Sequence, residues 1–455
     1  METLIILIFI GGYLAIALEH SLKLDKLIPA LAMMAILWAL VAFGIETFPN
    51  WFDSAGHKLV EGFSSFSADE KHHLLEETLL HHLGKTAEIL FFLLGAMTIV
   101  EIIDYFDGFA TFKNYIKTKN KKKLLWIFAF LAFILSAIID NLTATIVLIT
   151  ILQKIIDDKN TRLWFAGLII IAANAGGAWS PIGDVTTTML WIGKKVTTAK
   201  LIEYLIVPSL LCMAVPTFIA SFMKPFKGEI KNVIVKEESA TNKYGPTMLY
   251  LGLGAIMFVP IFKTVTHLPP YVGMMLSLSV VGIFAEIYSR SQFSISSAVD
   301  TEGQDSAGYH SPVHKSLTKI EMPSVLFFFG ILMAVAALES LGMLFIGAES
   351  LKTIIPNTDI VIMLLGVGSA IVDNVPLVAA SMGMFQEPVD SHLWHFIAFS
   401  AGTGGSMLII GSAAGVVAMG MEKIDFFWYF KKISWLAAVG FIVGAAAFLG
   451  LTAIF

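Results

Sequence analysis

The sequence predicts an all-α polytopic membrane protein made of two inverted repeats, with about ten transmembrane helices and two re-entrant hairpins. Of its 455 residues, 56% are hydrophobic and 14% are charged, whereas soluble domains carry roughly a quarter charged residues. Apolar runs such as 4–18, 124–139 and 435–455 approach or reach the length that crosses a bilayer core of about 30 Å. The third observation is a polar motif that occurs once in each half of the chain.

This motif reads Ser-Ala-Ile-Ile-Asp-Asn at 136–141 and Ser-Ala-Ile-Val-Asp-Asn at 369–374. An aspartate within hydrocarbon costs at least a few kcal/mol, so membrane proteins keep one there for a functional reason. Two such aspartates at matching places indicate a duplicated transporter with its working groups near the bilayer midplane.

The chain divides into two repeats, 1–222 and 245–455, joined by a cytoplasmic linker at 223–244. The apolar runs that precede and follow the repeated motif have the same order in both repeats. The expected spans are 3–18, 28–47, 86–107, 162–193, 201–222, 245–262, 271–288, 322–345, 392–420 and 432–453.

The repeated motif lies in the middle of two further apolar stretches, 124–153 and 357–385. Each stretch is about 30 residues long with polar residues at its centre, which favours a re-entrant hairpin over one straight helix. Non-helical backbone at that depth must face protein or water, so the hairpin tips are expected inside the molecule.

Two spans, 162–193 and 392–420, are expected to be broken helices. Glycine tolerates unusual backbone angles and proline removes a hydrogen-bond donor, so clusters of them unwind a helix. The residues expected at these breaks are Gly176, Gly177, Pro181 and Gly183 in the first half, and Thr403, Gly404, Gly405 and Gly411 in the second.

The distribution of positive charge predicts the orientation. When both motif-bearing stretches are treated as hairpins, most of the 30 basic residues fall on one side, which the positive-inside rule assigns to the cytoplasm. Both termini then face outward, and the two repeats start from opposite sides of the membrane. The repeats are therefore inverted, which is the symmetry on which alternating access usually rests.

The remaining segments are expected to be peripheral. The stretch 289–320 is predicted to be a flexible cytoplasmic connector, and 48–85, with five histidines, a short outer interfacial helix or a pH-sensing patch. Residues 1–18 lack the features of a cleaved signal peptide and are interpreted as a retained first span. The single cysteine, Cys212, excludes an internal disulfide.

The acids expected near the midplane are Asp140, Asp184 and Asp373. Burial favours the protonated form of a carboxyl group, whereas a bound cation favours the ionised form, so one site can exchange Na⁺ for H⁺ by competition. The non-functional interpretations are that the aspartates close the hairpin tips and that Asn141 and Asn374 only cap helices. The hydroxyl groups of nearby threonines can equally bond to their own helix.

The chain resembles the NhaD-type Na⁺/H⁺ antiporters of the ion transporter superfamily, which also contains arsenite permeases and dicarboxylate and citrate carriers. The resemblance covers nearly the whole chain and rests on the two Asp-Asn motifs and on Asn-Ala-Gly-Gly-Ala-Trp-Ser-Pro-Ile-Gly-Asp-Val-Thr-Thr at 174–187. Dicarboxylate carriers have Ser-Asn-Thr hairpin tips, whereas Leu142 and Val375 follow the asparagines here. This difference favours cation–proton exchange.

The resemblance implies an inverted-repeat antiporter, often dimeric through a scaffold domain, that carries Na⁺ or Li⁺ and H⁺. It implies no cofactor, no nucleic acid, a lipid environment, and a place in the bacterial inner membrane with a role in pH homeostasis. The implied site residues are Asp140, Asn141, Asn174, Asp184, Thr186, Thr187, Ser369, Asp373, Asn374 and Ser412, with Glu88 and Glu321 as weaker candidates.

Two other functions are compatible with the sequence. An arsenite, other oxyanion or dicarboxylate permease would share the fold and the duplication. An intramembrane aspartyl protease is a remote alternative, because Ile182-Gly183-Asp184 only partly matches the Gly-x-Gly-Asp motif of such enzymes. The residues favour a transporter over an enzyme, since a protease gives no reason for the repeated Asp-Asn tips.

Overall fold

The computed structural model describes residues 1–53, 58–116, 118–230, 242–297, 311–371 and 374–453. Over these residues the chain is almost entirely helical. One small antiparallel sheet pairs β1 (Phe52–Asp53) with β2 (Lys58–Leu59).

Nine of the described helices are long and apolar enough to cross a membrane, as expected for an integral membrane protein. Mean hydropathy in their most apolar windows lies between 1.2 and 2.3. They are α3 (Leu27–Gly44), α4 (Ala68–Tyr105), α5 (Lys121–Ile139), α7 (Lys159–Ala178), α9 (Thr198–Ala220), α10 (Gly245–Thr266), α11 (Pro270–Ser297), α13 (Met322–Ser340) and α20 (Ser434–Thr452).

Shorter helices complete the described chain, and several of them carry the motif residues. The α-helices are α1 (Glu2–Ala17), α2 (Glu19–Leu22), α6 (Asn141–Ile155), α8 (Val185–Ile192), α12 (Pro312–Leu317), α14 (Met343–Ile354), α15 (Thr358–Gly368), α16 (Asn374–Met384), α17 (His392–Gly404), α18 (Ala413–Glu422) and α19 (Phe426–Lys432). The 3₁₀ turns are η1 (Phe63–Ser65), η2 (Gly108–Tyr115), η3 (Lys224–Phe226) and η4 (Gly405–Met407).

Each stretch expected to form a hairpin is divided into two helices at its Asp-Asn motif. In the first half α5 ends at Ile139, α6 starts at Asn141, and the two helices pack against each other. In the second half α15 ends at Gly368 and α16 starts at Asn374. The polar groups therefore lie where helix geometry is interrupted.

Both spans expected to be broken are also divided. The first break separates α7 from α8, and the second separates α17 and η4 from α18. The residues that begin the second pieces, Asp184 and Ser412, have nearly the same backbone angles, with φ near −149° and −147° and ψ near 148° and 152°. Both accept a hydrogen bond from a backbone N–H of the helix that follows.

Corresponding residues of the two halves also make corresponding contacts. The Ser136 hydroxyl donates to the Ala173 carbonyl oxygen at 2.6 Å, and the Ser369 hydroxyl donates to the Ala401 carbonyl oxygen at 2.8 Å. Each of these bonds ties a hairpin helix to the broken helix of the same half. The duplication seen in the sequence therefore extends to the contacts that shape each half.

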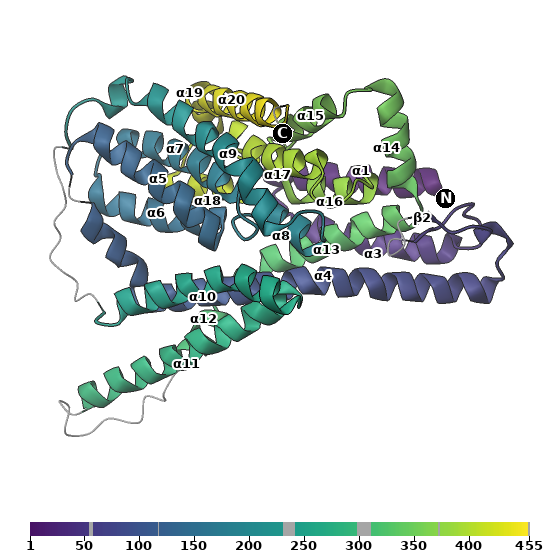
Figure 1. Ribbon diagram of the computed structural model, residues 1–455, viewed down its shortest axis with the longest axis horizontal. Helices are drawn as coiled ribbons and strands as arrows, with labels where there is room; N and C mark the ends of the chain where they lie inside the picture. The colour runs from purple at the N-terminus through teal and green to yellow at the C-terminus, as the bar shows by residue number, and fades with distance from the viewer. Residues whose placement is uncertain (54–57, 117, 231–241, 298–310, 372–373, 454–455) are drawn as a thin grey trace.

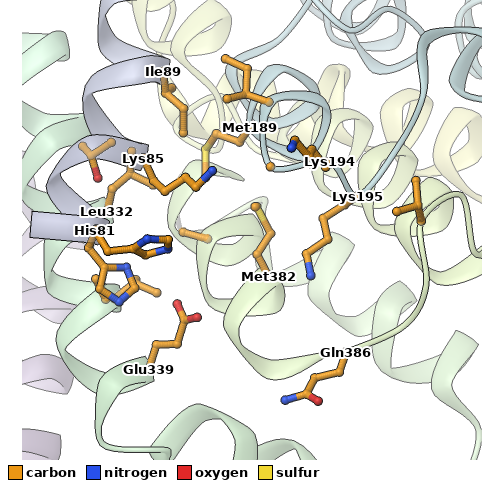
Figure 2. Close-up of a pocket in the computed structure, with 18 of the residues that line it drawn as sticks. His81, Lys85, Ile89, Met189, Lys194, Lys195, Leu332, Glu339, Met382 and Gln386 are labelled. Carbon is orange, nitrogen blue, oxygen red and sulfur yellow. The ribbon is translucent and has the colours of Figure 1, made fainter. Parts of the chain in front are cut away.

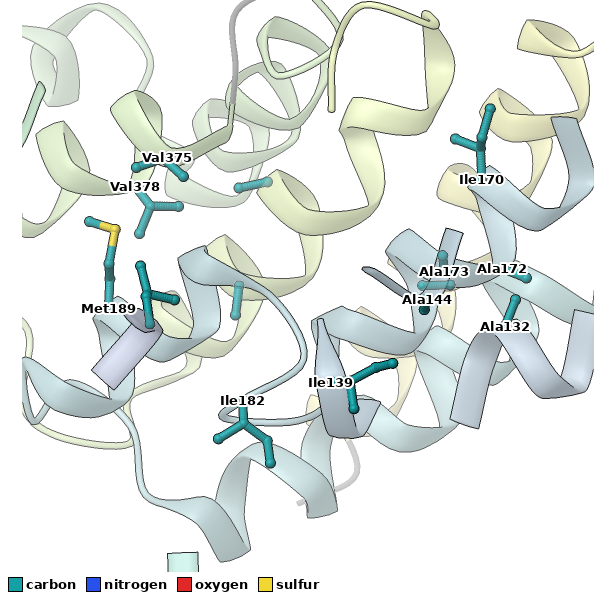
Figure 3. Packing of buried hydrophobic residues seen from close by; sticks show 14 of the residues in the cluster. Ala132, Ile139, Ala144, Ile170, Ala172, Ala173, Ile182, Met189, Val375 and Val378 are labelled. Carbon is teal, nitrogen blue, oxygen red and sulfur yellow. The ribbon is translucent and has the colours of Figure 1, made fainter. Parts of the chain in front are cut away.

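The two halves interlock around the helix breaks. Helix α18 packs on α6 and α7 of the first half, while α8 packs on α16 and α17 of the second half. Figure 3 shows Met189 of α8 beside Val375 and Val378 of α16, all three of them buried. Apolar side chains of both halves thus pack together where α8 meets α16.

A second group of helices lies along one side of this interlocked core. Helix α4 packs against α8, α10, α11 and α13, and α13 packs against α3 and α16. In Figure 1, α4 runs beneath the helices that carry the motifs, with α10 alongside it. The motif-bearing core therefore has a long helical neighbour on one side.

The structure corrects the expected interfacial helix within 48–85. Helix α4 begins at Ala68 and continues to Tyr105, so the histidine pairs belong to the first turns of one 38-residue helix. A capping box fixes this start: the Glu70 backbone N–H donates to the Ser67 side chain, and the Ser67 backbone N–H donates to the Glu70 carboxylate. The span expected at 86–107 is the second half of this helix.

The expected cytoplasmic connector at 289–320 is only partly described. Helix α11 extends to Ser297 and α12 covers Pro312–Leu317. The stretch 298–310 lies outside the described residues.

Candidate functional site

Asp184 is the buried acid at the first helix break. Its side chain is 2% exposed, and burial of an ionised carboxylate is costly unless hydrogen bonds compensate it. The Thr186 backbone N–H and the Thr186 hydroxyl each donate to Asp184 Oδ1 at 2.9 Å. The break between α7 and α8 provides these donors, because the first N–H groups of α8 have no partner within the helix.

Side-chain amides from both hairpins also point at Asp184. Asn141 Nδ2, at the start of α6, donates to Asp184 Oδ2 at 2.7 Å. Asn374 Nδ2, at the start of α16, donates to the same oxygen at 3.2 Å. One carboxylate therefore joins the Asp-Asn motif of each half to the first helix break.

Asn174 extends this network to the second helix break. Its Oδ1 accepts from Asn141 Nδ2 at 3.0 Å. Its Nδ2 donates to the Ser406 and Ser412 hydroxyls at 3.0 and 2.9 Å. Asn174 is fully buried in α7, and these bonds involve both the oxygen and the nitrogen of its side-chain amide. The two serines lie 232 and 238 residues away from it in the sequence.

Asp140 occupies the first hairpin tip, next to this network. Its φ is +86°, in a region that non-glycine residues rarely adopt. The Thr143 backbone N–H donates to Asp140 Oδ1 at 2.8 Å and the Thr143 hydroxyl to Oδ2 at 2.9 Å, so the carboxylate caps α6. Asp140 and Asp184 also line the same cavity of about 20 Å³, which lies against α4 and α10.

The structure brings six expected site residues into one hydrogen-bonded network and a seventh, Asp140, into the adjoining cavity. The donors and acceptors come from α6, α7, α8, α16 and the residues before α18, so the network spans both halves of the chain. The six are Asn141, Asn174, Asp184, Thr186, Asn374 and Ser412.

Other expected residues have backbone partners instead. The Thr187 hydroxyl donates to the Asp184 carbonyl oxygen at 2.9 Å, and the Ser369 and Thr403 hydroxyls donate to the Ala401 and Phe399 carbonyl oxygens. Neither weaker candidate lines the cavity that holds Asp140 and Asp184: Glu88 is a half-buried residue of α4, and Glu321 is an exposed residue before α13. Asp373 lies outside the described residues.

The glycines at the breaks permit close backbone contacts. A Cβ on Gly176 would collide with the Phe133 carbonyl oxygen, and one on Gly404 would collide with the Gly366 carbonyl oxygen. The remaining glycines make similar approaches within each break, and the Pro181 carbonyl oxygen accepts from the Thr188 hydroxyl at 2.9 Å. Those glycines are Gly177, Gly183, Gly405 and Gly411.

Ser406 was not among the expected site residues, although its hydroxyl accepts a hydrogen bond from the Asn174 amide. Its backbone carbonyl oxygen accepts from the buried Tyr429 hydroxyl at 2.9 Å, which fixes the turn that presents the hydroxyl. The signal was present, since Ser406 follows the glycine pair that was expected to break the second helix.

The chemistry of the network suits a small cation or a proton. Carboxylate, amide and hydroxyl oxygens are hard ligands of the kind that dehydrated alkali ions take, and no cysteine or histidine is among the six side chains. In this structure donor groups of Asn141, Thr186 and Asn374 point at the Asp184 carboxylate. A cation entering there would replace amide hydrogens with amide oxygens, which a rotation of the asparagine side chains provides.

The chain matches known proteins over nearly its whole length. Residues 13–395 match the model of a family described as citrate transporter. The chain is 41% identical over 449 residues to sodium/proton antiporter 1 of Arabidopsis thaliana, covering 97% of this chain and 71% of that protein. It is 30% identical over 465 residues to the Na⁺/H⁺ antiporter NhaD of Alkalimonas amylolytica, covering 98% of this chain and 90% of the relative.

A solved structure shares the fold at low sequence identity. The YdaH transporter of Alcanivorax borkumensis, whose crystal structure is described as having an unusual topology, superimposes with a TM-score of 0.56 at 13% identity. The match covers 93% of this chain and 97% of that one. At this identity the likeness concerns the fold alone.

Proposed function

We propose that this chain, which belongs to the citrate transporter family and to the NhaD-type Na⁺/H⁺ antiporters, exchanges Na⁺ for H⁺ across its membrane. The observation that carries the proposal is the buried Asp184 carboxylate, which receives amide hydrogens from both halves of the chain. The names of the relatives point to the same chemistry, and they do not favour the oxyanion or dicarboxylate alternatives.

In the proposed mechanism Na⁺ and H⁺ compete for the same carboxylates. Asp184 takes the central role, with Asp140 beside it and Asp373 as the expected third acid. The amides of Asn141, Asn174 and Asn374 and the hydroxyls of Thr186 and Ser412 supply further oxygens. Because one carboxylate cannot hold both ions at once, loading on one side and release on the other give exchange.

The proposal includes alternating access based on inverted repeats. The hairpins and broken helices would move as one body past α4, α10, α11 and α13, carrying the ion between the two faces. The equivalent contacts of Ser136 and Ser369 support the duplication on which such a movement depends. The same proposal includes transport of Li⁺, outward-facing termini, an inner-membrane location and a homodimer joined through the scaffold domain.

Everted membrane vesicles from cells that lack their own antiporters test the function. A pH gradient is formed, a pH-sensitive dye is quenched, and Na⁺, Li⁺ or K⁺ is added across a range of pH. We expect Na⁺ to restore fluorescence with the unchanged protein and the Asp184→Asn variant to give none above background. Asp158→Asn is the matched control, since Asp158 caps α7 at an exposed position.

Exchange that persists in the Asp140→Asn, Asp184→Asn and Asp373→Asn variants would contradict the proposed site. Uptake of labelled citrate or arsenite without cation-dependent proton movement would contradict the proposed substrate. Both measurements use the same membranes. The amount of the protein is measured in each preparation, so a variant that is absent from the membrane is not mistaken for one that is inactive.

A further inference from the structure

A cavity of about 620 Å³ lies between α4 and α13 on one side and α8 and α16 on the other. Figure 2 shows Lys85 of α4, Glu339 of α13 and Lys195, from the segment after α8, lining the space. Lys85, Lys194 and Gln386 are exposed, so the cavity has a hydrated rim.

Part of the lining of this cavity is apolar and buried. Ile89 of α4 and Met189 of α8 line it, and they are 6% and 1% exposed. In Figure 2 these two side chains lie near each other and close to Lys85. The cavity therefore passes from charged, exposed residues to buried hydrocarbon.

The 20 Å³ cavity beside Asp184 begins one helical turn further along the same two helices. On α4 its lining starts at Phe92 and includes Ala96, and on α8 it includes Val185 and Thr188. Residues 85, 89, 92 and 96 are spaced by four, three and four positions, so they share one face of α4. Both cavities thus lie along the seam between α4 and α8, where Ile89 and Met189 line the larger one and Phe92 and Thr188 line the smaller one.

We infer that the larger cavity is the vestibule through which the cation reaches Asp184, and that Ile89, Met189 and Phe92 form the barrier that closes it here. This inference rests on the proposed function. Phe92 is 1% exposed and meets Trp191 edge to face, with ring centroids 6.1 Å apart. The barrier therefore consists of packed apolar side chains from both sides of the seam.

An apolar barrier of this kind blocks a hydrated ion without any charged side chain in the path. A cation that enters it loses water and gains no ligand, so the layer excludes ions while it remains dry. A shift of α8 along α4 separates Met189 from Ile89 and opens the layer to water. The movement proposed for the hairpins and broken helices carries α8, because α8 packs on α16 and α17.

Cysteine labelling in detergent micelles tests the route. Cys212, the single cysteine, is replaced by alanine, and one cysteine is introduced at a time as Lys194→Cys at the rim or Ala96→Cys beyond the barrier. We expect a water-soluble methanethiosulfonate reagent to modify the Lys194→Cys variant roughly tenfold faster than the Ala96→Cys variant. In the Ala96→Cys protein, adding Ile89→Ala or Met189→Ala should raise the labelling rate roughly fivefold.

Phe91→Ala is the matched control, since Phe91 is a neighbouring α4 residue that is 54% exposed and lines neither cavity. It should leave the labelling rate of the Ala96→Cys protein unchanged. Two barrier variants are used so that poor folding of one does not decide the outcome, and elution as a single species qualifies each protein. Equal labelling at the rim and beyond the barrier, or no acceleration in either barrier variant, overturns the inference.

The labelling does not depend on transport. Proteins that label as expected but exchange no Na⁺ would leave the route standing and remove the proposed function. Proteins that exchange Na⁺ but label without the expected pattern would leave the function standing and remove the route.

Discussion

The two threonines that follow Asp184 differ in what their hydroxyls contact. The Thr186 hydroxyl donates to the Asp184 carboxylate, whereas the Thr187 hydroxyl donates to backbone carbonyl oxygens of Asp184 and Gly177. Both side chains are fully buried. Thr186 therefore contacts the acid, whereas Thr187 contacts the backbone of the helix break.

Replacing each threonine by valine tests this difference, because valine has nearly the same shape and no hydroxyl. We expect Thr186→Val to raise the Na⁺ concentration for half-maximal exchange by roughly tenfold, as expected for the loss of about 1.4 kcal/mol of a hydrogen bond to a charged group. Thr187→Val should change it much less. Concentration curves from the dequenching assay measure both, and an equal effect would contradict the distinction.

At this scale the sequence predicted the acid and most of its partners, but not every one of them. Asn141, Asp184 and Asn374 stand in motifs whose polar character is unusual in apolar sequence, so they could be selected without a structure. Ser406 could not be paired with Asn174, because 232 residues separate them and only the fold brings the hydroxyl to the amide.

At the level of elements, close helix packing depends on glycine at a few positions. Gly404 in α17 faces the Gly366 carbonyl oxygen of α15, and a methyl group there would have to displace backbone. We expect Gly404→Ala to lower the thermal unfolding temperature and to reduce the yield of monodisperse protein. Gly450→Ala in α20, where nothing lies within 4 Å, is the control and should behave like the unchanged chain.

Helix α7 has a titratable cap outside the membrane-spanning segments. The Thr161 hydroxyl and backbone N–H donate to the Asp158 carboxylate, and these bonds hold the pKa of Asp158 below its ordinary value. A lowered pKa means that the cap stabilises the fold at neutral pH, and that this stabilisation is lost as the pH falls through the folded-state pKa.

Asp158→Ala should therefore lower the unfolding temperature at neutral pH, by an amount that corresponds to about 1 kcal/mol. The difference from the unchanged chain should shrink as the pH is lowered below about 4, the ordinary pKa of an aspartate. Asn120→Ala removes the non-titrating cap of α5 and should have an effect that does not depend on pH. Thermal melts across pH measure both, and parallel curves for the two variants would contradict the assignment.

The start of α4 shows what local sequence allows at the scale of elements. Ser67 and Glu70 form the capping box at this start, and their spacing can be recognised in the sequence. The polar residues that follow were nevertheless interpreted as a separate interfacial helix. The helix continues because no cluster of glycines and prolines interrupts 68–105, whereas glycines with Pro181 mark the break before α8 and glycines alone mark the break before α18. The helix breaks could be predicted from composition. The full length of α4 could be predicted only by recognising that the capping box starts a helix at Ala68.

At the scale of the whole molecule, an ion pair between a buried glutamate and a partly exposed arginine joins the two halves. Arg162 Nε at the start of α7 lies 3.1 and 3.0 Å from the two carboxylate oxygens of Glu422 at the end of α18. The Glu422 side chain is 1% exposed. Breaking a buried pair by removing one partner is costly because the other charge remains buried, whereas removing both avoids this cost.

We expect Arg162→Met to lower the unfolding temperature more than the double variant Arg162→Met/Glu422→Met does. Melts of the unchanged chain, the two single variants and the double variant complete the cycle. An additive loss in the double variant would show that the two side chains stabilise the fold independently. Lys200→Met/Glu203→Met is the control, since that ion pair is exposed and should be nearly neutral.

The membrane class, the helical fold and the division of the chain at the motifs could all be predicted from the sequence. These features depend on hydropathy and on glycine and proline clusters, which are local signals. The ion pair between Arg162 and Glu422 and the vestibule beside α4 depend on which helices meet, and no local signal specifies that. The packing of α8 on α16 and of α18 on α6 is of the same kind.

The two helix breaks are alike in backbone but unlike in charge, because Asp184 stands in one where Ser412 stands in the other. Under an inverted-repeat cycle, the two faces of the membrane would then meet the carboxylate through different surroundings. We therefore expect the apparent affinity for Na⁺ to differ between the two sides of the membrane. Right-side-out and everted vesicles should therefore give different apparent affinities, and this inequality would make exchange faster in one orientation than in the other at the same non-saturating ion gradients.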